Sequence, residues 1–425
     1  MESCQFQQIK NFMSSTTIFY ILNAVIIFNF LLSRILEYLN QSYSKSELPS
    51  ELSSFYDAEK YKKSQQYHKE SDRLGMWAEV ISFIVMISFL WLNGFAWLNN
   101  ILEPHFTNKI ILALIYFGVL SIGSSIISLP FGIYSTYVIE EKYGFNKTTV
   151  RTYIMDKIKG ILLSIVLGGG LGYLFLWLII SIGPNFWIYA WGLGILITLF
   201  LQMFYTSLIV PIFNKLSPLP AGELRDKIET YARSVNFPLT NVMIINGSKR
   251  STKANAYFTG FGKGKKIVLY DTLIEKHSNE ELVSILAHEV GHYKKKHIIL
   301  SMILSWLQMG FMVWLLSRFI FSDTLSAALG VNHLAIHINL IVFSILFEPI
   351  SLITGILMNI LSRKNEYEAD EFAVKTSDKP AFVKALINLS VDNLSNLKPH
   401  PSYVFFHYSH PTLLQRIGAI EKVEL

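Results

Sequence analysis

Seven stretches of this chain are apolar over about 20 residues, the length that an α-helix needs to cross about 30 Å of hydrocarbon. Of the 425 residues, 51% are hydrophobic and 16% are charged, whereas soluble domains carry about 25% charged residues. This composition excludes disordered and fibrous proteins and predicts a predominantly α-helical, polytopic membrane protein. The predicted spans are residues 17–33, 76–98, 110–129, 158–182, 186–213, 298–321 and 334–361.

Basic residues are distributed unevenly between the two sides of the predicted membrane region. The connections 34–75 and 130–157 carry seven and four Lys or Arg residues, whereas the opposite side carries at most Lys10, Lys109 and Arg318. Because Lys and Arg in short loops favour the cytosol, we expect the C-terminus inside and the N-terminus outside. The membrane would be that of the ER in a eukaryote or the inner membrane in a bacterium. For the net charge of +6, the placement of the charges between apolar runs matters more than their sum, and no nucleic-acid partner is expected.

Two polar segments divide the chain into four regions. We expect spans one to five in the first, a cytosolic-side catalytic segment in the second, spans six and seven in the third, and a segment that completes the site in the fourth. The regions are residues 1–213, 214–297, 298–361 and 362–425. The first polar segment has an α+β pattern, because helical spacing is followed by two short apolar runs typical of strands. These elements are expected at residues 223–234, 242–245 and 266–270, the last after a glycine turn at 262–264.

The chain contains an H-E-x-x-H motif, formed by His288, Glu289 and His292. Residues four apart share one helix face, so both imidazoles can reach one Zn²⁺ while the Glu lies beside the reacting water. The alternative is a pair of polar histidines on an exposed helix. The motif lies in an apolar context that would bury both rings, and buried imidazoles need partners.

A catalytic zinc needs a third protein ligand and one open position. The single cysteine, Cys4, excludes a thiolate cluster and an internal disulfide. If one continuous helix is assumed, His297 lies away from the metal face, so we expect it at the surface or behind a ligand. Glu366 and Asp370 are four apart, so one can bind metal while the other orients an imidazole; a charged helix start is the open alternative. Glu368 lies on another face and is expected to be solvated.

Two acids within predicted spans, Glu79 and Glu348, are costly against lipid and should face water or protein. Their presence is consistent with polar space inside the bundle. Helix packing with protonated carboxyl groups is the competing interpretation.

Eight motifs occur in an order that resembles the type I CAAX prenyl proteases, a family of integral-membrane zinc metalloproteases that cleave prenylated C-terminal peptides. The resemblance covers nearly the whole chain and implies a zincin-like catalytic region, with seven spans around a large water-filled chamber and the zinc at its cytosolic end. Val290 and Tyr293 stand where Leu and Trp are common in the family. The motifs are residues 139–147, 211–220, 247–250, 255–258, 269–273, 288–292, 366–370 and 407–412.

The resemblance also implies a role for each residue of the zinc site. One zinc ion per chain would be bound by His288, His292 and Glu366. Glu289 would be the general base that takes a proton from the attacking water and returns it to the leaving amine. Asp370 would orient a ligating imidazole.

Outside the zinc ligands, the resemblance implies that His410 is a second donor to the oxyanion and Arg416 a substrate anchor. By spacing alone these two are an ordinary loop histidine and a helix-surface charge. Asn255, Ala256 and Tyr257 would lie in an edge strand that holds an extended peptide by main-chain hydrogen bonds. The alternative there is an edge strand without a ligand.

The expected partners are the bilayer and a peptide or protein substrate, possibly prenylated, and the protein is expected to be monomeric. Without a known organism, a quality-control metalloprotease with no prenyl requirement stays open. A site-2-type protease would carry its motif within an apolar span, and bacterial heat-shock membrane proteases are shorter. A transporter with a structural zinc is another alternative, but it has no use for Glu289 beside an open metal position.

Overall fold

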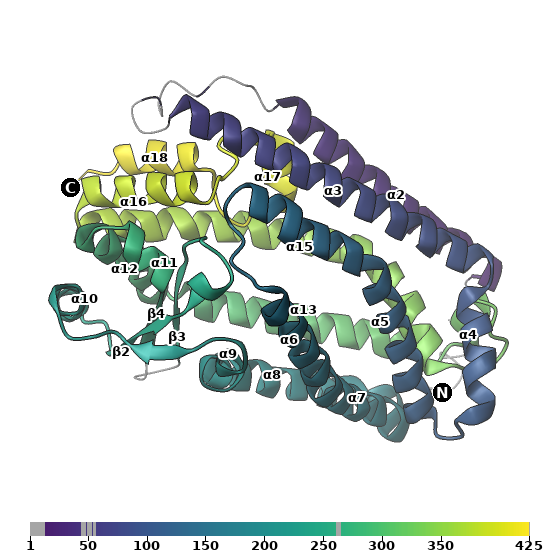
Figure 1. The fold of residues 1–425 in the computed structure, drawn as a ribbon. Helices are drawn as coiled ribbons and strands as arrows, with labels where there is room; N and C mark the ends of the chain where they lie inside the picture. The colour runs from purple at the N-terminus through teal and green to yellow at the C-terminus, as the bar shows by residue number, and fades with distance from the viewer. Residues whose placement is uncertain (1–12, 44–47, 49–52, 54–56, 261–264, 425) are drawn as a thin grey trace.

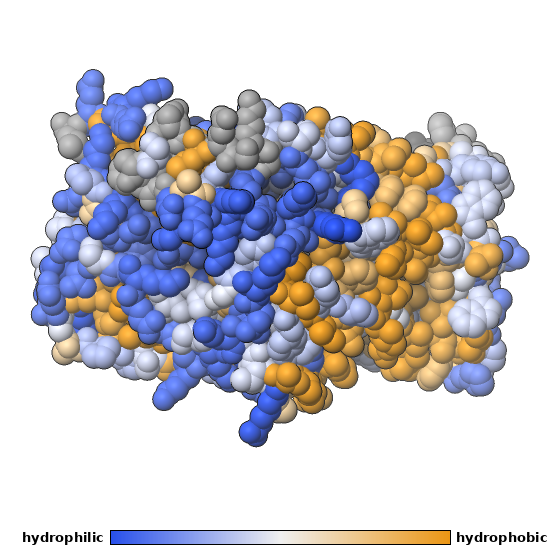
Figure 2. All heavy atoms as spheres, turned by 45° about the horizontal axis from the view of Figure 1, so that its top comes forward, coloured by the Kyte–Doolittle hydropathy of each residue, from blue (hydrophilic) through white to orange (hydrophobic). Residues whose placement is uncertain are grey.

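The computed structural model describes residues 13–43, 48, 53, 57–260 and 265–424. Cys4 and the glycine turn expected at residues 262–264 lie outside these ranges. Figure 1 shows long helices that form most of the molecule, with a small sheet and several shorter helices gathered at one end. Figure 2 shows polar side chains over that end and a band of hydrophobic side chains beside it. The protein is therefore a mostly helical polytopic membrane protein that carries a polar, sheet-containing region.

Within the described residues, six helical runs are long and apolar enough to cross a membrane. Three shorter helices, α4 (Gly94–Leu102), η2 (Glu103–His105) and α14 (Asp323–Ala328), lie in the connections. The six runs are α2 (Ser15–Tyr43), α3 (Ala58–Trp91), α5 with η3 (Lys109–Tyr134 and Ser135–Glu140), the run Val150–Phe213, α13 (His297–Phe319) and α15 (Ile336–Thr376).

The run Val150–Phe213 contains both the fourth and the fifth predicted spans, which is why length alone gives six runs rather than seven. Its middle is the turn η5, where Gly183 has a φ of 71°, a value that residues with a side chain rarely adopt. Ile179 before the turn and Phe186 after it share one buried cluster. The run comprises α6 (Val150–Leu163), η4 (Ser164–Gly168), α7 (Gly169–Ile182), η5 (Gly183–Asn185), α8 (Phe186–Phe204), η6 (Tyr205–Ile209) and α9 (Val210–Phe213).

The two acids predicted to need water or protein both find polar partners on α2. Asn29 donates to Glu348 Oε2 over 2.5 Å, and Arg34 forms an ion pair with Glu79. These contacts link α2 to α15 and α3. Protein contacts therefore satisfy part of the polar requirement of both carboxylates.

The sheet has four strands in the order β1-β2-β4-β3. β1 is antiparallel to β2, β2 is parallel to β4, and β4 is antiparallel to β3. Among the described strands, β3 pairs with β4 alone, so its other edge is open. The two predicted strands are present and slightly longer than expected, whereas β1 was not predicted. The strands are β1 (Leu216–Pro218), β2 (Leu239–Ile245), β3 (Ala256–Thr259) and β4 (Lys265–Tyr270).

Seven short elements complete the polar region, and three of them, α10, α11 and α12, contact the strands of the sheet. The predicted helix at 223–234 is present as α10. The helix of the H-E-x-x-H motif, α12, begins after Ser278, whose hydroxyl accepts a hydrogen bond from the Glu281 N–H. Its buried face, including Leu282 and Leu286, packs in one core with strands β2 and β4 and helix α16. The seven elements are α10 (Glu223–Ser234), η7 (Gly247–Lys249), α11 (Asp271–Lys276), α12 (Asn279–Lys294), α16 (Lys379–Asp392), α17 (Pro401–His407) and α18 (Leu413–Glu421).

Arg250 joins the polar region to the membrane helices. Its Nε and one terminal nitrogen donate to both oxygens of Asp156 on α6, over 2.7 and 2.8 Å. The guanidinium also donates to the Asn214 side chain and the Phe213 carbonyl. A two-pronged arginine–carboxylate pair fixes orientation as well as distance, so the sheet has a defined placement on α6 and α9.

Candidate metal centre

Three side chains predicted as ligands lie together where α12 meets α15. His288 and His292 come from α12 and Glu366 from α15, and one donor atom of each lies within 4.8 Å of the others. The His292 Nε2 atom is 3.1 Å from His288 Nε2. Glu366 approaches these nitrogens at 3.4 Å from His288 and 3.2 Å from His292. The chain therefore brings two imidazole nitrogens and a carboxylate to one point.

Gly291, inside the motif, allows α15 to approach α12 closely enough for this contact. A Cβ atom at this position would lie 3.0 Å from both the Cα and the carbonyl oxygen of Ala369. Such a contact with backbone cannot be relieved by a side-chain rotation. The glycine therefore sets the distance between the two helices that carry the three donors.

His288 is held from behind by Asp370 and Arg416. The imidazole Nδ1 is 2.8 Å from Asp370 Oδ1, and Arg416 donates to both oxygens of the same carboxylate over 2.5 and 2.8 Å. Because an ionised carboxylate can only accept a hydrogen bond, the proton of a neutral His288 ring lies on Nδ1. The Nε2 lone pair then faces His292 and Glu366. Burial lowers the pKa of His288, but the neighbouring carboxylates of Asp370 and Glu366 outweigh that effect and raise the pKa to about 9, so Nε2 favours a cation, which is either a proton or a metal ion.

His292 is held by a second chain of contacts, through His297 and Glu368. The Nδ1 atoms of His292 and His297 are 3.1 Å apart, and His297 Nε2 is 3.1 Å from Glu368 Oε2. If Glu368 accepts from His297 Nε2, then His297 Nδ1 accepts from His292 Nδ1. The Nε2 lone pair of His292 is then left facing Glu366, as it is in His288.

Of the two expectations for His297, the structure supports the second, because the side chain is buried behind the ligand His292 and not at the surface. The expectation for Glu368 is wrong, since Glu368 contacts His297 instead of being only solvated. Both expectations treated the motif as part of one continuous helix. α12 ends at Lys294, and Lys296 has a left-handed φ of 59°, so the chain turns and returns His297 to the metal side. The feature that the sequence analysis missed is this helix break before the next span.

Glu289 is partly buried and follows His288 on α12. Burial raises the pKa of its carboxyl group, while the nearby His288 and His292 act in the opposite direction. A raised pKa suits a group that exchanges a proton near neutral pH. The structure thus places the predicted base next to the three donors.

His410 and Arg416 both reach the centre from the C-terminal segment. His410 lies in the loop before α18, with Nε2 3.3 Å from Glu366 Oε1 and Nδ1 2.9 Å from the Ser409 hydroxyl. Arg416 is largely buried on α18, and its Nε and one terminal nitrogen are engaged with Asp370. These contacts place it behind His288, and its role as a substrate anchor stays a prediction.

The predicted edge-strand residues lie at the open side of the sheet. The Asn255 carbonyl accepts from the Tyr270 N–H, so Tyr257 also faces β4 by alternation, whereas Ala256 and Phe258 direct their main-chain groups outward. The Ala256 N–H is bonded to the Asn255 side chain over 2.8 Å. The main-chain groups directed to the open edge, apart from this N–H, are therefore the Ala256 carbonyl and the N–H and carbonyl of Phe258.

The three donors fit a metal ion. Both Nδ1 atoms are occupied from behind, so two Nε2 lone pairs and a carboxylate face one another. The Glu366 Oε2 atom is buried and has no hydrogen-bond donor among the residues that the structure describes. Two histidines and one carboxylate are the protein ligands of many catalytic zinc sites, in which a fourth position is left to water. His288, His292 and Glu366 can therefore hold a metal ion.

Comparison with known proteins places this geometry in a family. Residues 218–424 match the model of peptidase family M48, and residues 37–215 match that of the CAAX prenyl protease N-terminal region, described as five membrane helices. The chain belongs to the CAAX prenyl protease 1 family. The predicted resemblance is confirmed, and membership identifies the protein as an M48 metalloprotease, which sets aside the transporter alternative.

Individual members of the CAAX prenyl protease 1 family match over most of this chain. It is 40% identical over 322 residues to the CAAX prenyl protease 1 homolog of Oryza sativa subsp. japonica, which covers 75% of each chain. It is 33% identical over 410 residues to CAAX prenyl protease 1 of Saccharomyces cerevisiae, 90% of each. The crystal structure of S. mikatae Ste24p superposes with a TM-score of 0.90 at 32% identity, covering 95% of this chain and 99% of that one.

Proposed function

We propose that this protein is a zinc-dependent endopeptidase that hydrolyses a peptide bond near the C-terminus of prenylated CAAX-type proteins. The observation that carries the proposal is the meeting of the His288 and His292 Nε2 atoms with the Glu366 carboxylate, beside Glu289. Relatives named CAAX prenyl protease 1, similar over most of the chain, support the substrate class.

In this proposal, His288, His292 and Glu366 hold one zinc ion. A bound zinc ion supplies Lewis acidity, which polarises the scissile carbonyl and makes a water molecule more acidic. Glu289 removes a proton from the attacking water and then delivers it to the nitrogen of the leaving amine. Asp370 and Arg416 keep the proton of His288 on Nδ1, and His297 with Glu368 does the same for His292.

His410 acts as a donor to the oxyanion that develops on the scissile carbonyl. A hydrogen bond from the Ser409 hydroxyl to His410 Nδ1, whose atoms are 2.9 Å apart, leaves the proton of a neutral imidazole on Nε2. That Nε2 faces the site, 3.3 Å from Glu366. A donor placed where negative charge develops stabilises the transition state more than the ground state.

We infer further that α7 and α8 cross the membrane separately, which gives seven spans. Their reversal at Gly183 and the 64-residue length of the run support this inference, because an unbroken helix of that length would extend about 96 Å. The asymmetry of basic residues supports a cytosolic metal centre. Following the family resemblance, the spans would enclose a water-filled chamber, which is consistent with the exposed polar contact between Asn29 and Glu348.

The substrate is tested with purified full-length protein and two matched peptides that differ only in the prenyl group on cysteine. We expect zinc-dependent cleavage of the prenylated peptide, with a much lower kcat/KM for its unprenylated match. Glu289→Gln serves as the inactive control. Equal cleavage of both peptides would instead favour a quality-control peptidase, an alternative that main-chain pairing along β3 also allows, since such pairing is tolerant of sequence.

Orientation is tested with a maleimide that cannot cross the membrane of intact cells. Native Cys4 should be labelled from outside, whereas a cysteine introduced by Ser402→Cys in a Cys4→Ser background should not. The reverse labelling pattern would place the metal centre on the other side of the membrane.

A further inference from the structure

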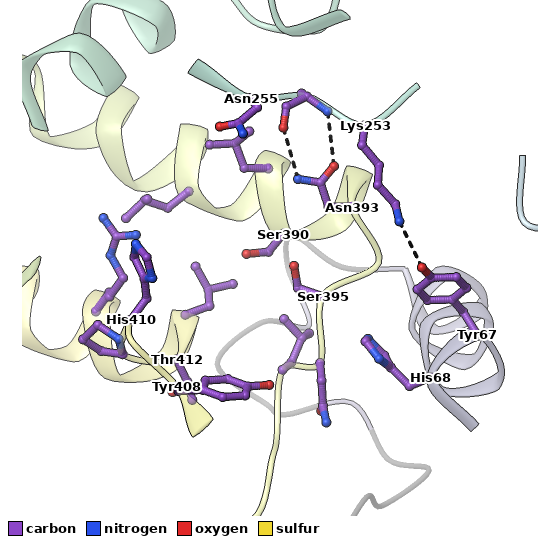
Figure 3. A pocket seen from close by; sticks show the side chains of 18 of the residues that line it. Tyr67, His68, Lys253, Asn255, Ser390, Asn393, Ser395, Tyr408, His410 and Thr412 are labelled. Carbon is purple, nitrogen blue, oxygen red and sulfur yellow. Dashed lines mark hydrogen bonds between the residues drawn. The ribbon is translucent and has the colours of Figure 1, made fainter. Parts of the chain in front are cut away.

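A cavity of about 800 Å³ lies beside the metal centre (Figure 3). One part of its wall contains His410 and Arg416, which contact the metal ligands or their partners. Another part contains Tyr67 and His68 from the start of α3 and Lys253 from the segment before β3. The cavity thus leads from the reacting bond to a cluster that takes no part in the proton transfers.

The Lys253 ammonium is held at this cavity by groups from two other elements. Its Nζ donates to the Tyr67 hydroxyl over 3.0 Å and to Glu140 Oε1 over 3.1 Å, and it lies 4.4 Å from the centre of the Phe145 ring. An ammonium has three N–H donors, and the described residues accept two of them. Burial lowers the pKa of Lys253, but Tyr67 and Glu140 outweigh it and raise the pKa, so the group is a cation at neutral pH.

Two cationic side chains other than histidine line this cavity, and they differ in what they can still bind. Arg416 uses its Nε and one terminal nitrogen on Asp370 behind His288, and its other terminal nitrogen lies 3.9 Å from a Glu366 oxygen, beside the metal ligands. Lys253 retains one donor, and about a third of its side chain is exposed. The segment that carries it is fixed to the end of α16, because the Ala254 N–H donates to the Asn393 side chain over 3.3 Å. A ligand anion in the cavity would therefore meet Lys253 at a defined place.

The two ends of β3 lie in different surroundings. At the C-terminal end, the Thr206 hydroxyl of η6 donates to Thr259 over 3.0 Å, so this end borders a membrane-spanning run. At the N-terminal end, Asn255 lines the cavity. In a CAAX protein the lipid is on the cysteine, and the free carboxyl terminus follows three residues later. A substrate with its lipid toward the membrane therefore runs antiparallel to β3 and directs its C-terminus toward Lys253.

We propose that this cavity holds the three residues that follow the prenylated cysteine, and that Lys253 binds their free C-terminal carboxylate. This inference rests on the proposed function. Three extended residues cover roughly 10 Å, and ligand cavities commonly measure about 300 to 1,000 Å³. Binding the terminus at a fixed place sets the distance from chain end to scissile bond. The lysine thereby acts as a specificity determinant for removal of a tripeptide.

The test compares two prenylated peptides of one sequence, which end in a free carboxylate or in a carboxamide. With the wild-type enzyme we expect kcat/KM to be about tenfold higher for the free acid, as for the loss of one charge-assisted contact. Lys253→Met should bring the acid down to the level of the amide and leave the amide unchanged. Lys253→Arg should keep a preference for the acid, and Lys249→Met, at an exposed lysine outside the cavity, should behave as wild type.

The wild-type comparison decides the question even if Lys253→Met fails to fold, because it needs no variant. Equal kcat/KM for acid and amide in the wild type would overturn the carboxylate site. An unaltered acid preference in a Lys253→Met protein with normal zinc content would overturn the assignment to Lys253. Failure of the zinc-loaded wild type to cleave either peptide would instead refute the proposed function.

Discussion

The two ends of α15 both carry clusters of histidine and acidic side chains, yet the clusters differ in how their polar atoms face one another. At the start of the helix, buried His337 Nε2 is 2.8 Å from the Asn99 side-chain oxygen, and the Asn99 nitrogen donates to Glu103 over 2.9 Å. The other oxygen of Glu103 meets His333 at 2.9 Å. Each donor in this far cluster has an acceptor opposite it.

At the metal centre, on the last turns of α15, acceptors face acceptors. The Nδ1 protons of His288 and His292 are directed away, so two lone pairs and the Glu366 carboxylate point toward one space. Such a set is stable only when a cation, either a metal ion or protons, lies among the three groups. The comparison teaches that the direction of lone pairs, more than residue type or burial, separates a metal site from a structural histidine network.

The largest expected effect is loss of the metal. His292→Ala or Glu366→Ala should abolish stoichiometric zinc binding and peptidase activity, because two donors cannot maintain the site. Zinc content is measured by elemental analysis of the purified protein, alongside turnover. The control is His337→Gln at the other end of α15, which should retain one zinc. Normal zinc content in Glu366→Ala would show that the third ligand is misassigned.

Glu289→Gln should separate proton transfer from metal binding. Turnover is expected to fall between about 10² and 10⁴-fold, the range for loss of a general base, because the amide cannot accept the proton. Zinc content should stay at wild-type level, since Glu289 is not among the three donors. A variant that keeps its activity would contradict the proposed mechanism.

His410→Phe should lower kcat by about 10² to 10³-fold, or about 3 to 4 kcal/mol, if its Nε2 donates to the oxyanion. The zinc content should not change. His407→Phe provides a matched change in the same segment, at a histidine that contacts the Tyr403 ring instead of the metal ligands. Equal kcat values for His410→Phe and His407→Phe would show that His410 is an ordinary loop residue.

Glu368→Gln tests the chain of contacts behind His292. Loss of the carboxylate weakens the bond that keeps His297 protonated at Nε2, so we expect zinc affinity to fall by about 10 to 100-fold, as for other outer partners of metal ligands. Competition with a chelator measures this directly. Glu371→Gln, on the same helix but paired with Lys375, is the control. An unchanged affinity would mean that His297 does not orient His292.

The smallest effect is expected in the far cluster. His337→Leu leaves buried Asn99 without its imidazole partner, at a cost of about 1 to 3 kcal/mol. The apparent Tm should fall by a few degrees, whereas zinc affinity and kcat should remain those of the wild type. His337→Gln, which can still donate to Asn99, should recover most of the stability. A change in zinc affinity would show that the two ends of α15 are coupled.

The sequence was sufficient for features that depend on regular spacing. Residues four apart on a helix gave His288 with His292 and Glu366 with Asp370, and runs of apolar residues gave the membrane helices. The strand β1 was missed because Pro218 normally ends regular structure; here it lies in an edge strand, where proline is tolerated. The contact of His297 and Glu368 with His292 depends on the left-handed conformation of a single residue, Lys296, which no periodic pattern reveals.

Contacts between distant segments could not be predicted from the sequence either. That Gly291 sets the approach of α15 follows only once Ala369 is known to lie opposite it. The same holds for Arg250, which the family motifs included without a role, and for Arg416, whose partner Asp370 lies 46 residues away in the chain. Such residues are recognised when the helices that carry them are placed side by side.

One helix also fixes the height at which the enzyme works above the bilayer. α15 continues without interruption from its apolar stretch, which ends near residue 361, through Glu366 to Thr376. At about 1.5 Å per residue, the Glu366 carboxylate is carried only about 8 Å along the helix beyond that stretch. A peptide bond within a folded soluble domain does not easily reach a metal centre so close to the bilayer. A peptide bond beside a lipid anchor is held near the bilayer surface by the anchor itself.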